Sequence, residues 1–183
     1  MIQALVSDVY HRHWGEPSRR AHFQTGDVHM EILKWDSTVT DEGVDLYATL
    51  GSCNYPASTM HANHRAEYIM GLLPGRDEVA PTLASVGVYT MRNREDLDHG
   101  HTLPVEGDLW PGAKMNYLLI TRPTPPLIPA LQHENGLHVE FMQVTPIFAS
   151  EKAFKGEFGV ESLLDKWMAS GTPFWSPNRS PNP

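Results

Sequence analysis

Apolar and polar residues alternate along the chain with two different periods, and these periods predict helices and strands. Apolar residues at helical spacing predict an amphipathic helix over residues 2–13, which ends before Gly15 and Pro17. Alternating positions then predict strands over residues 28–35 and 45–50, the first with one buried face. The polar stretch between these two strands is typical of a turn, so we expect them to form a hairpin.

The middle of the chain predicts one more strand and one helix. Residues 67–73 are mostly apolar and predict the third strand. Asp77 can cap a helix over residues 78–91, in which Pro81 is tolerated because it falls in the first turn. Residues 92–113 are predicted to form a long polar loop.

The last third of the chain predicts two strands and two helices. The strands cover residues 116–121 and 137–142, and a run of prolines prevents regular structure between them. Ser150 can cap a short helix that breaks near Gly159, and a second helix then ends at Gly171. The apolar stripe of this second helix is expected to contain Val160, Leu163, Leu164, Trp167 and Met168.

This order of elements predicts an α+β fold, in which helices pack on a mostly antiparallel mixed sheet within a single domain. The regular strand–helix alternation of a doubly wound sheet is missing. With 183 residues the chain is long enough for one domain with its own core. We expect that domain to cover residues 1–171. A proline-rich tail, residues 172–183, follows it and is either frayed or held on the surface by Phe174 and Trp175.

Composition and charge favour a soluble, globular protein. No run approaches the roughly 18 apolar residues of a membrane span. The start of the chain lacks the basic and apolar blocks of a signal peptide, so we expect a cytoplasmic protein. The net charge of −8 disfavours binding to nucleic acid and to anionic lipid, and it favours encounter with basic partners.

Cys53 is the only cysteine, and it lies in a loop directly after a predicted strand. One interpretation makes it a catalytic nucleophile, which requires a base or a positive charge to stabilise the thiolate. The other makes it a small apolar residue packed in a tight loop. The neighbouring sequence Gly51-Ser-Cys-Asn54 matches neither the papain-like nor the caspase-like pattern. The sequence also contains no nucleophile elbow and no glycine-rich phosphate loop.

Two of the closely spaced pairs among the ten histidines are candidates for a metal site. His61 and His64 are separated by two residues, and His99 and His101 by one. Such spacings occur in metal sites, but zinc needs three or four converging ligands, and neither HExxH nor CxxC is present. The histidines are therefore either exposed loop residues or the ligands of a metal-dependent hydrolase, in which His99 and His101 act together with His61 or His64.

Four segments of the chain share features with one known family of domains. A strand and its glycine-containing loop cover residues 46–56, a strand follows at 64–69, a Gly-His-Thr loop lies at 100–104, and a strand, a turn and two helices cover 141–165. In this order they resemble the Suppressor of Fused-like domain family over about residues 1–170. Members usually carry serine where this chain has Cys53, so the resemblance implies that Cys53 is a structural substitution.

The resemblance implies a non-enzymatic, protein-binding domain without a cofactor. Animal members of the family sequester transcription factors by holding an extended peptide between two domains. Bacterial single-domain members resemble immunity proteins that bind and block a cognate toxin. We therefore expect a protein partner, such as a basic toxin, and leave the oligomeric state open. By resemblance, Tyr47 and Glu67 lie near the partner-binding face, and Asn54 and Tyr55 in the adjacent loop are further candidates.

Overall fold

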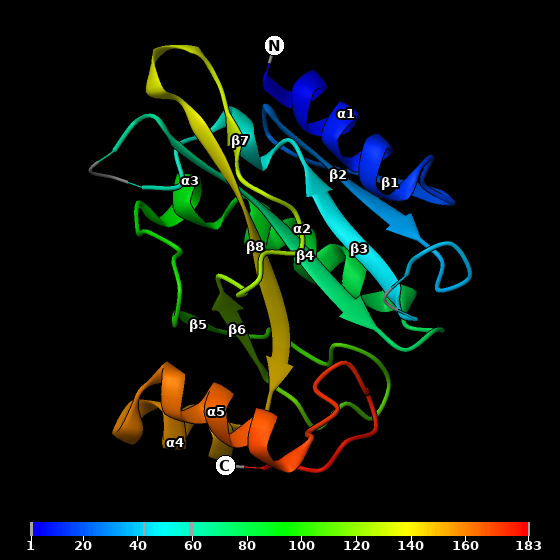
Figure 1. The fold of residues 1–183 in the computed structure, drawn as a ribbon, viewed down its shortest axis with the longest axis vertical. Coiled ribbons are helices and arrows are strands. Elements are labelled where there is room, and N and C mark those ends of the chain that lie inside the picture. The colour runs from blue at the N-terminus through cyan, green and yellow to red at the C-terminus, as the bar shows by residue number, and fades with distance from the viewer. Residues whose placement is uncertain (1, 42, 59–60, 183) are drawn as a thin grey trace.

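In the part of the chain that the structure describes, eight strands form one mixed sheet (Figure 1). They are β1 (Arg19–Thr25), β2 (Val28–Trp35), β3 (Asp45–Leu50), β4 (His64–Leu72), β5 (Thr102–Pro104), β6 (Tyr117–Thr121), β7 (Leu131–Gln132) and β8 (His138–Ile147). Their order along the sheet is β1-β2-β3-β4-β8-β6-β5, and β7 pairs with β8 beside this path. The structure is a computed structural model that describes residues 2–41, 43–58 and 61–182.

The pairing of the strands is mostly antiparallel. β4 and β8 run parallel, with His64 opposite His138, whereas the other paired strands of the described residues are antiparallel. The predicted hairpin of β2 and β3 is present, with Trp35 opposite Leu46. This mixed sheet, with helices packed on it in a single domain, confirms the predicted α+β fold.

Over the described residues, five helices and three 3₁₀ turns complete the structure. They are α1 (Ile2–Trp14), η1 (Ser52–Asn54), η2 (Asp77–Val79), α2 (Ala80–Gly87), α3 (Tyr89–Asn93), η3 (Glu134–Gly136), α4 (Ala149–Phe158) and α5 (Val160–Ser170). α1 covers one face of the sheet and α2 the other, while α4 and α5 pack together beyond the end of β8 (Figure 1). Within the described ranges, no helix is both long and apolar enough to cross a membrane.

The central strands are buried on both faces, because a helix covers each side of the sheet. Ala48 and Ile69 lie in the apolar cluster under α1, whereas Tyr47 and Tyr68 lie in the cluster under α2. All positions from residue 32 to 35 of β2 are buried. The prediction that this strand buries one face was therefore wrong for its second half.

Three strands lie where the pattern predicted none. β1 is a polar edge strand that joins the sheet through its backbone pairing with β2. β5 lies in the predicted polar loop, whose Leu97, Leu109 and Trp110 are in fact buried. β7 lies in the proline-rich connection, and β8 continues to Ile147 instead of ending at Met142.

The helix predicted over residues 78–91 is divided into η2, α2 and α3. Pro81 does lie in the first turn of α2. Asp77 caps no helix, because its carboxylate instead binds Lys34 at 2.7 Å. The polar groups near the start of this helix are therefore used for contacts with the sheet.

The two C-terminal helices are close to their predicted positions, but two of their residues have other roles. Glu151, and not Ser150, accepts a hydrogen bond from the backbone N–H of Phe148 at the start of α4, at 3.0 Å. Met168 is 79% exposed and lies off the apolar stripe of α5. Gly171 ends that helix as predicted, with a φ of 62°.

The proline-rich tail lies on the domain and is not frayed over its described residues. The Phe174 ring stacks on Trp167 at a centroid distance of 6.1 Å. The backbone N–H of Leu73 donates to the carbonyl oxygen of Trp175 at 3.0 Å. Further along, the side chain of Arg179 is 1% exposed, so the tail contributes to the interior as well as to the surface.

Candidate functional site

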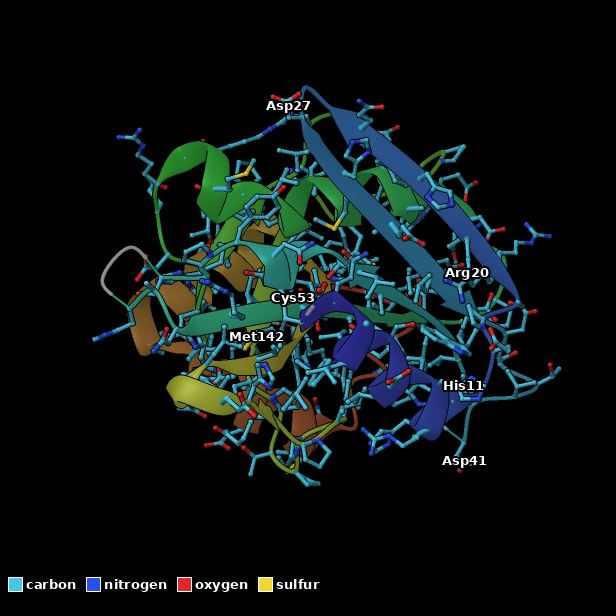
Figure 2. The ribbon with its side chains drawn as sticks, turned by 90° about the horizontal axis from the view of Figure 1, so that it is seen from above. His11, Arg20, Asp27, Asp41, Cys53 and Met142 are labelled. Atoms are coloured by element: carbon cyan, nitrogen blue, oxygen red, sulfur yellow. The ribbon has the colours of Figure 1, made fainter. Side chains whose placement is uncertain are left out.

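Cys53 lies in η1, the short turn that follows β3, and a glutamate of the neighbouring strand β4 holds this turn. Figure 2 shows Cys53 near the middle of the molecule, close to the start of α1. Glu67 Oε1 accepts hydrogen bonds from the backbone N–H groups of Gly51 and Cys53, both at 3.0 Å. Its Oε2 accepts the Thr49 hydroxyl at 2.5 Å. Glu67 therefore fixes the turn from the interior of the protein.

Gly51 is the residue that allows the chain to enter this turn. Its φ of 125° lies in a region that favours glycine. A Cβ atom at this position would lie 3.1 Å from the carbonyl oxygen of His29 on β2. The turn is thus packed closely against the sheet, which brings its N–H groups within reach of Glu67.

Cys53 and Glu67 are both 0% exposed. Burial, followed by the charge and hydrogen bonding of Glu67, raises the pKa of the Cys53 thiol. Burial also raises the pKa of Glu67, although hydrogen bonds from Thr49 and the turn act in the opposite direction. A nucleophilic cysteine needs the reverse, an accessible sulfur with a lowered pKa. The surroundings of Cys53 suit a small packed residue.

Tyr47 is buried as well, and its hydroxyl belongs to a polar cluster where β2, β3 and η2 meet. Tyr47 donates to Asp77 Oδ1 at 2.8 Å, and Lys34 Nζ lies 2.7 Å from the same oxygen. Lys34 also lies 2.9 Å from Asp45, and Arg19 lies 2.6 Å from the second oxygen of Asp77. The hydrogen bond from Lys34 lowers the pKa of Asp77 more than burial raises it. In this conformation Tyr47 joins elements of the fold.

Asn54 and Tyr55 differ from Tyr47 and Glu67, because they line a groove at the surface. This groove of about 530 Å³ lies between η1, the start of α1 and the β1–β2 hairpin, whose tip is marked by Asp27 in Figure 2. Asn54 is exposed and donates to Gln3 Oε1 of α1 at 2.8 Å, and Tyr55 is half-buried. Of the four predicted partner-binding residues, Asn54 and Tyr55 are the two that a partner could contact at the surface.

The histidines predicted to bind a metal are held in separate contacts. His99 Nε2 lies 2.8 Å from Glu161 Oε1, and His99 Nδ1 accepts the backbone N–H of Arg122 at 3.0 Å. His101 Nδ1 accepts a backbone N–H of its own loop at 3.0 Å, and His61 is exposed. In the part of the chain that the structure describes, the four histidines of the predicted hydrolase site form no common ligand set.

His64 instead meets a histidine that the sequence pattern did not single out. His64 Nδ1 lies 2.8 Å from His138 Nε2, because the parallel strands β4 and β8 place these residues in register. Glu140 completes a group of three side chains whose ligand atoms all lie within 4.8 Å of one another. Burial lowers the pKa of His64, although the charge of Glu140 acts in the opposite direction.

Part of the group formed by His64, His138 and Glu140 could have been recognised from the sequence. The alternation of the last strand places His138 and Glu140 on one face, because side chains two residues apart point the same way. The missing information was the parallel pairing with a strand that lies 74 residues away in the sequence. Hydrophobic periodicity does not specify such long-range pairing.

Comparisons with known proteins agree on one family. A sequence model of the suppressor of fused protein (SUFU) family matches residues 26–180, which extends past residue 171 into the tail. No curated protein sequence matched the chain significantly. Among solved structures, a protein described as a SUFU homologue from Neisseria gonorrhoeae FA 1090 superimposes with a TM-score of 0.76 at 17% identity, covering 99% of this chain and 96% of that one.

Two further structures are similar at lower scores. The Sufu–Fu complex matches with a TM-score of 0.67 at 15% identity, covering 98% of this chain and 89% of that one. Drosophila Suppressor of Fused matches with a TM-score of 0.64 at 15% identity and 98% coverage, but this chain spans only 49% of its length. At these identities the superpositions show a shared fold, whereas the match to the family model over residues 26–180 shows the family. The chain belongs to the suppressor of fused (SUFU) family.

Proposed function

We propose that this chain is a protein-binding domain of the immunity type, which binds and blocks a cognate toxin or regulates another partner protein in the cytoplasm. The observation that carries the proposal is membership of a family in which Sufu has been crystallised in a complex with Fu. Binding of this kind requires a complementary surface and no catalytic group. The buried environment of Cys53 is consistent with such a role.

The groove lined by Asn54 and Tyr55 is the proposed contact surface. A half-buried tyrosine can insert an aromatic ring into a partner while its hydroxyl remains free to hydrogen-bond, which is typical of residues that dominate binding energy. Asn54 provides amide donors and acceptors beside it. Glu67 contributes indirectly in this proposal, because it holds the turn that carries Asn54. Tyr47 likewise contributes through the sheet beneath.

The charge of the chain favours a basic partner. A net charge of −8 attracts a positively charged protein over a distance of about 10 Å at moderate salt and raises the association rate. Complementary charge of this kind affects the association rate more than the final affinity. A basic toxin would therefore be captured quickly, which is the property that an immunity protein needs.

The experiment that tests this proposal has two stages. The tagged protein is first used to capture partners from its native lysate, with mass spectrometry of the co-eluting proteins. The captured protein is then titrated against wild type, Tyr55→Ala and Asn54→Ala. We expect one stoichiometric partner, and we expect Tyr55→Ala to weaken binding at least tenfold, or about 1.4 kcal/mol.

Controls separate the class of function from the position of the surface. Phe158→Ala removes an aromatic ring that is 53% exposed on α4, away from the groove, and should leave affinity unchanged. Equal affinities for Tyr55→Ala and wild type would contradict the proposed surface but not the binding function. Co-expression that fails to protect cells from the captured protein would contradict the immunity role. An association rate that does not change with salt would contradict the electrostatic part.

A further inference from the structure

We propose that His64, His138 and Glu140 form a binding site for one zinc-class divalent metal ion. The three side chains come from two adjacent strands, and one ligand atom of each lies within 4.8 Å of the others. Two imidazole nitrogens and a carboxylate oxygen are a donor set that zinc takes in proteins, with a water molecule in the fourth position. All three residues are partly exposed to solvent.

The strand pairing makes the arrangement rigid. His64 on β4 lies directly opposite His138 on β8, and Glu140 lies opposite Ala66, two residues further along the same face. Because the ligands stand on neighbouring strands of a sheet and not on flexible loops, their backbone positions are fixed before an ion binds. Sites built on strands hold their geometry more precisely than sites built on loops.

The distance between the two histidines is compatible with an ion after a small movement. His64 Nδ1 and His138 Nε2 are 2.8 Å apart, which is a hydrogen-bond distance. Two nitrogens that bind one tetrahedral zinc at about 2.0 Å are separated by about 3.3 Å. The rings therefore have to separate by about half an ångström, which side-chain rotation alone can supply.

The second nitrogen of His138 already has a suitable partner. His138 Nδ1 lies 3.5 Å from the carbonyl oxygen of Gly136. A proton on Nδ1 that points at this oxygen leaves the lone pair of Nε2 directed towards His64. Metal-binding histidines commonly donate their other N–H to a carbonyl or a carboxylate in this way, which fixes the ring. His64 then binds through Nδ1 after its proton moves to Nε2.

Glu140 is also held by a neighbour that leaves one oxygen available. Arg122 donates to Glu140 Oε2 from both Nε and Nη2, at 2.9 and 2.7 Å, so Oε1 is the atom that would turn to the ion. His99 lies nearby, but its two nitrogens are engaged with Glu161 and with the backbone of Arg122. The proposed ligand set therefore shares only His64 with the set that the histidine spacing predicted.

The test is titration of ZnCl₂ into the 183-residue chain after its tag has been removed and the protein has been treated with a chelator. We expect one ion per chain by calorimetry, and a rise in melting temperature on addition of zinc. His64→Ala and His138→Ala should each weaken binding at least tenfold, and Glu140→Gln should weaken it as well. His61→Ala is the matched control, because this exposed histidine lies only three positions from His64, and it should bind zinc like wild type.

A second measurement keeps the proposal testable if a variant does not fold. Side-chain NMR spectra of wild type should show shifts of the His64 and His138 ring nitrogens on addition of zinc, while those of His99 stay in place. The proposal is overturned if wild type shows no saturable zinc binding. It is also overturned if a His64→Ala/His138→Ala double variant binds within twofold of wild type, or if His61→Ala weakens binding as much as His138→Ala.

Discussion

Glu67 and Glu151 are both 0% exposed, but the protein compensates for their burial in different ways. The partners of Glu67 are uncharged: two backbone N–H groups of the η1 turn and the Thr49 hydroxyl. Glu151 is bound by a cation from the C-terminal tail, since Arg179 Nη1 and Nη2 lie 2.5 and 2.8 Å from its two oxygens. One site is a hydrogen-bond network, and the other is a buried ion pair.

The two sites also differ in how they depend on distant parts of the chain. The partners of Glu67 belong to the turn and the strand directly beside it. Arg179 comes from the end of the chain, where its guanidinium lies 4.9 Å from the Phe148 ring and 5.1 Å from the Trp167 ring and also donates to a backbone carbonyl at 3.0 Å. A single side chain of the tail therefore supplies the cation that pairs with Glu151 and packs against two aromatic rings.

We expect the largest loss of stability when the buried ion pair between Glu151 and Arg179 is broken. Arg179→Ala leaves the Glu151 carboxylate buried without its cation, and breaking a buried pair in this way costs about 3–5 kcal/mol. We expect a loss of this size in the free energy of unfolding, measured by urea denaturation. Truncation after Trp175 removes the same side chain and should have a similar effect.

Two controls identify the cause of this loss. Arg92→Ala removes an exposed arginine and should change stability by less than about 0.5 kcal/mol. In the double variant Glu151→Gln/Arg179→Met the charge has been removed together with its partner, so stability should recover partly relative to Arg179→Ala. A double variant that is less stable than Arg179→Ala would indicate that packing, and not the unpaired charge, dominates.

The second prediction is a smaller loss at the hydrogen-bond network. Glu67→Ala leaves the N–H groups of Gly51 and Cys53 and the Thr49 hydroxyl without their acceptor, but it leaves no charge behind. We expect a loss of about 2–3 kcal/mol in urea denaturation, less than for Arg179→Ala. Glu157→Ala, at an exposed position of α4, is the matched control and should be near neutral. A larger loss of stability for Glu67→Ala than for Arg179→Ala would contradict the expected order of the two effects.

The third prediction concerns the pH dependence of stability, which measures the free-energy cost of burying the ionised Glu67 carboxylate without a cation. Burial raises the pKa of Glu67 above its ordinary value of 4.5, so the folded protein binds the proton at a higher pH than the unfolded chain. Wild type should therefore gain stability relative to Glu67→Gln as the pH falls through the raised pKa towards 4.5. The slope is at most about 1.4 kcal/mol per pH unit, and the difference becomes constant below 4.5.

Urea denaturation of wild type and Glu67→Gln at a series of pH values measures this slope. Other groups, such as Asp77 with its lowered pKa, lose their stabilising contribution as the pH falls, but they are common to both proteins and cancel in the difference. Glutamine keeps an oxygen for the two N–H groups, so this variant should fold. A difference that stays constant from pH 8 to pH 4 would contradict the prediction.

The sequence predicted α1, α5 and the central strands from the spacing of their apolar residues, although β3 and most of β4 are buried on both faces. Edge strands such as β1 and β5 were missed because β1 is rich in polar residues and β5 has only three residues, and both are held by backbone pairing with their neighbours. The family was also predicted correctly from four degenerate segments. Each segment alone is only weakly specific, but the order of the four segments along the chain identified the family even though individual residues differ.

The roles of single charged residues could not be predicted in the same way. The resemblance placed Glu67 near the partner-binding face, but it did not indicate that the Glu67 carboxylate is buried and holds the η1 turn. Arg179 lies in a tail that was expected to be either frayed or held on the surface, and only the tertiary structure shows that it pairs with the buried Glu151. The group of His64, His138 and Glu140 depends on the parallel pairing of two distant strands. Buried polar contacts of this kind are decided by tertiary structure.

The smallest expected effect belongs to Cys53→Ser. Glu67 is close enough for its charge and hydrogen bonding to raise the pKa of the Cys53 thiol, and a serine hydroxyl is a better donor to the same carboxylate. The gain in hydrogen bonding offsets the loss of a buried sulfur, so the free energy of unfolding should change by less than about 1 kcal/mol. Cys53→Ala, which removes the donor, should lose more.

The same variant decides between the two interpretations of this cysteine. Because Cys53 is 0% exposed, the native protein should resist alkylation by iodoacetamide until urea unfolds it, and the two transitions should coincide. Cys53→Ser should then bind its partner as wild type does, since the network around Glu67 holds the turn with either residue. Rapid alkylation of the native protein, together with loss of function in Cys53→Ser, would show instead that the sulfur reacts, and the network would have to open to expose it.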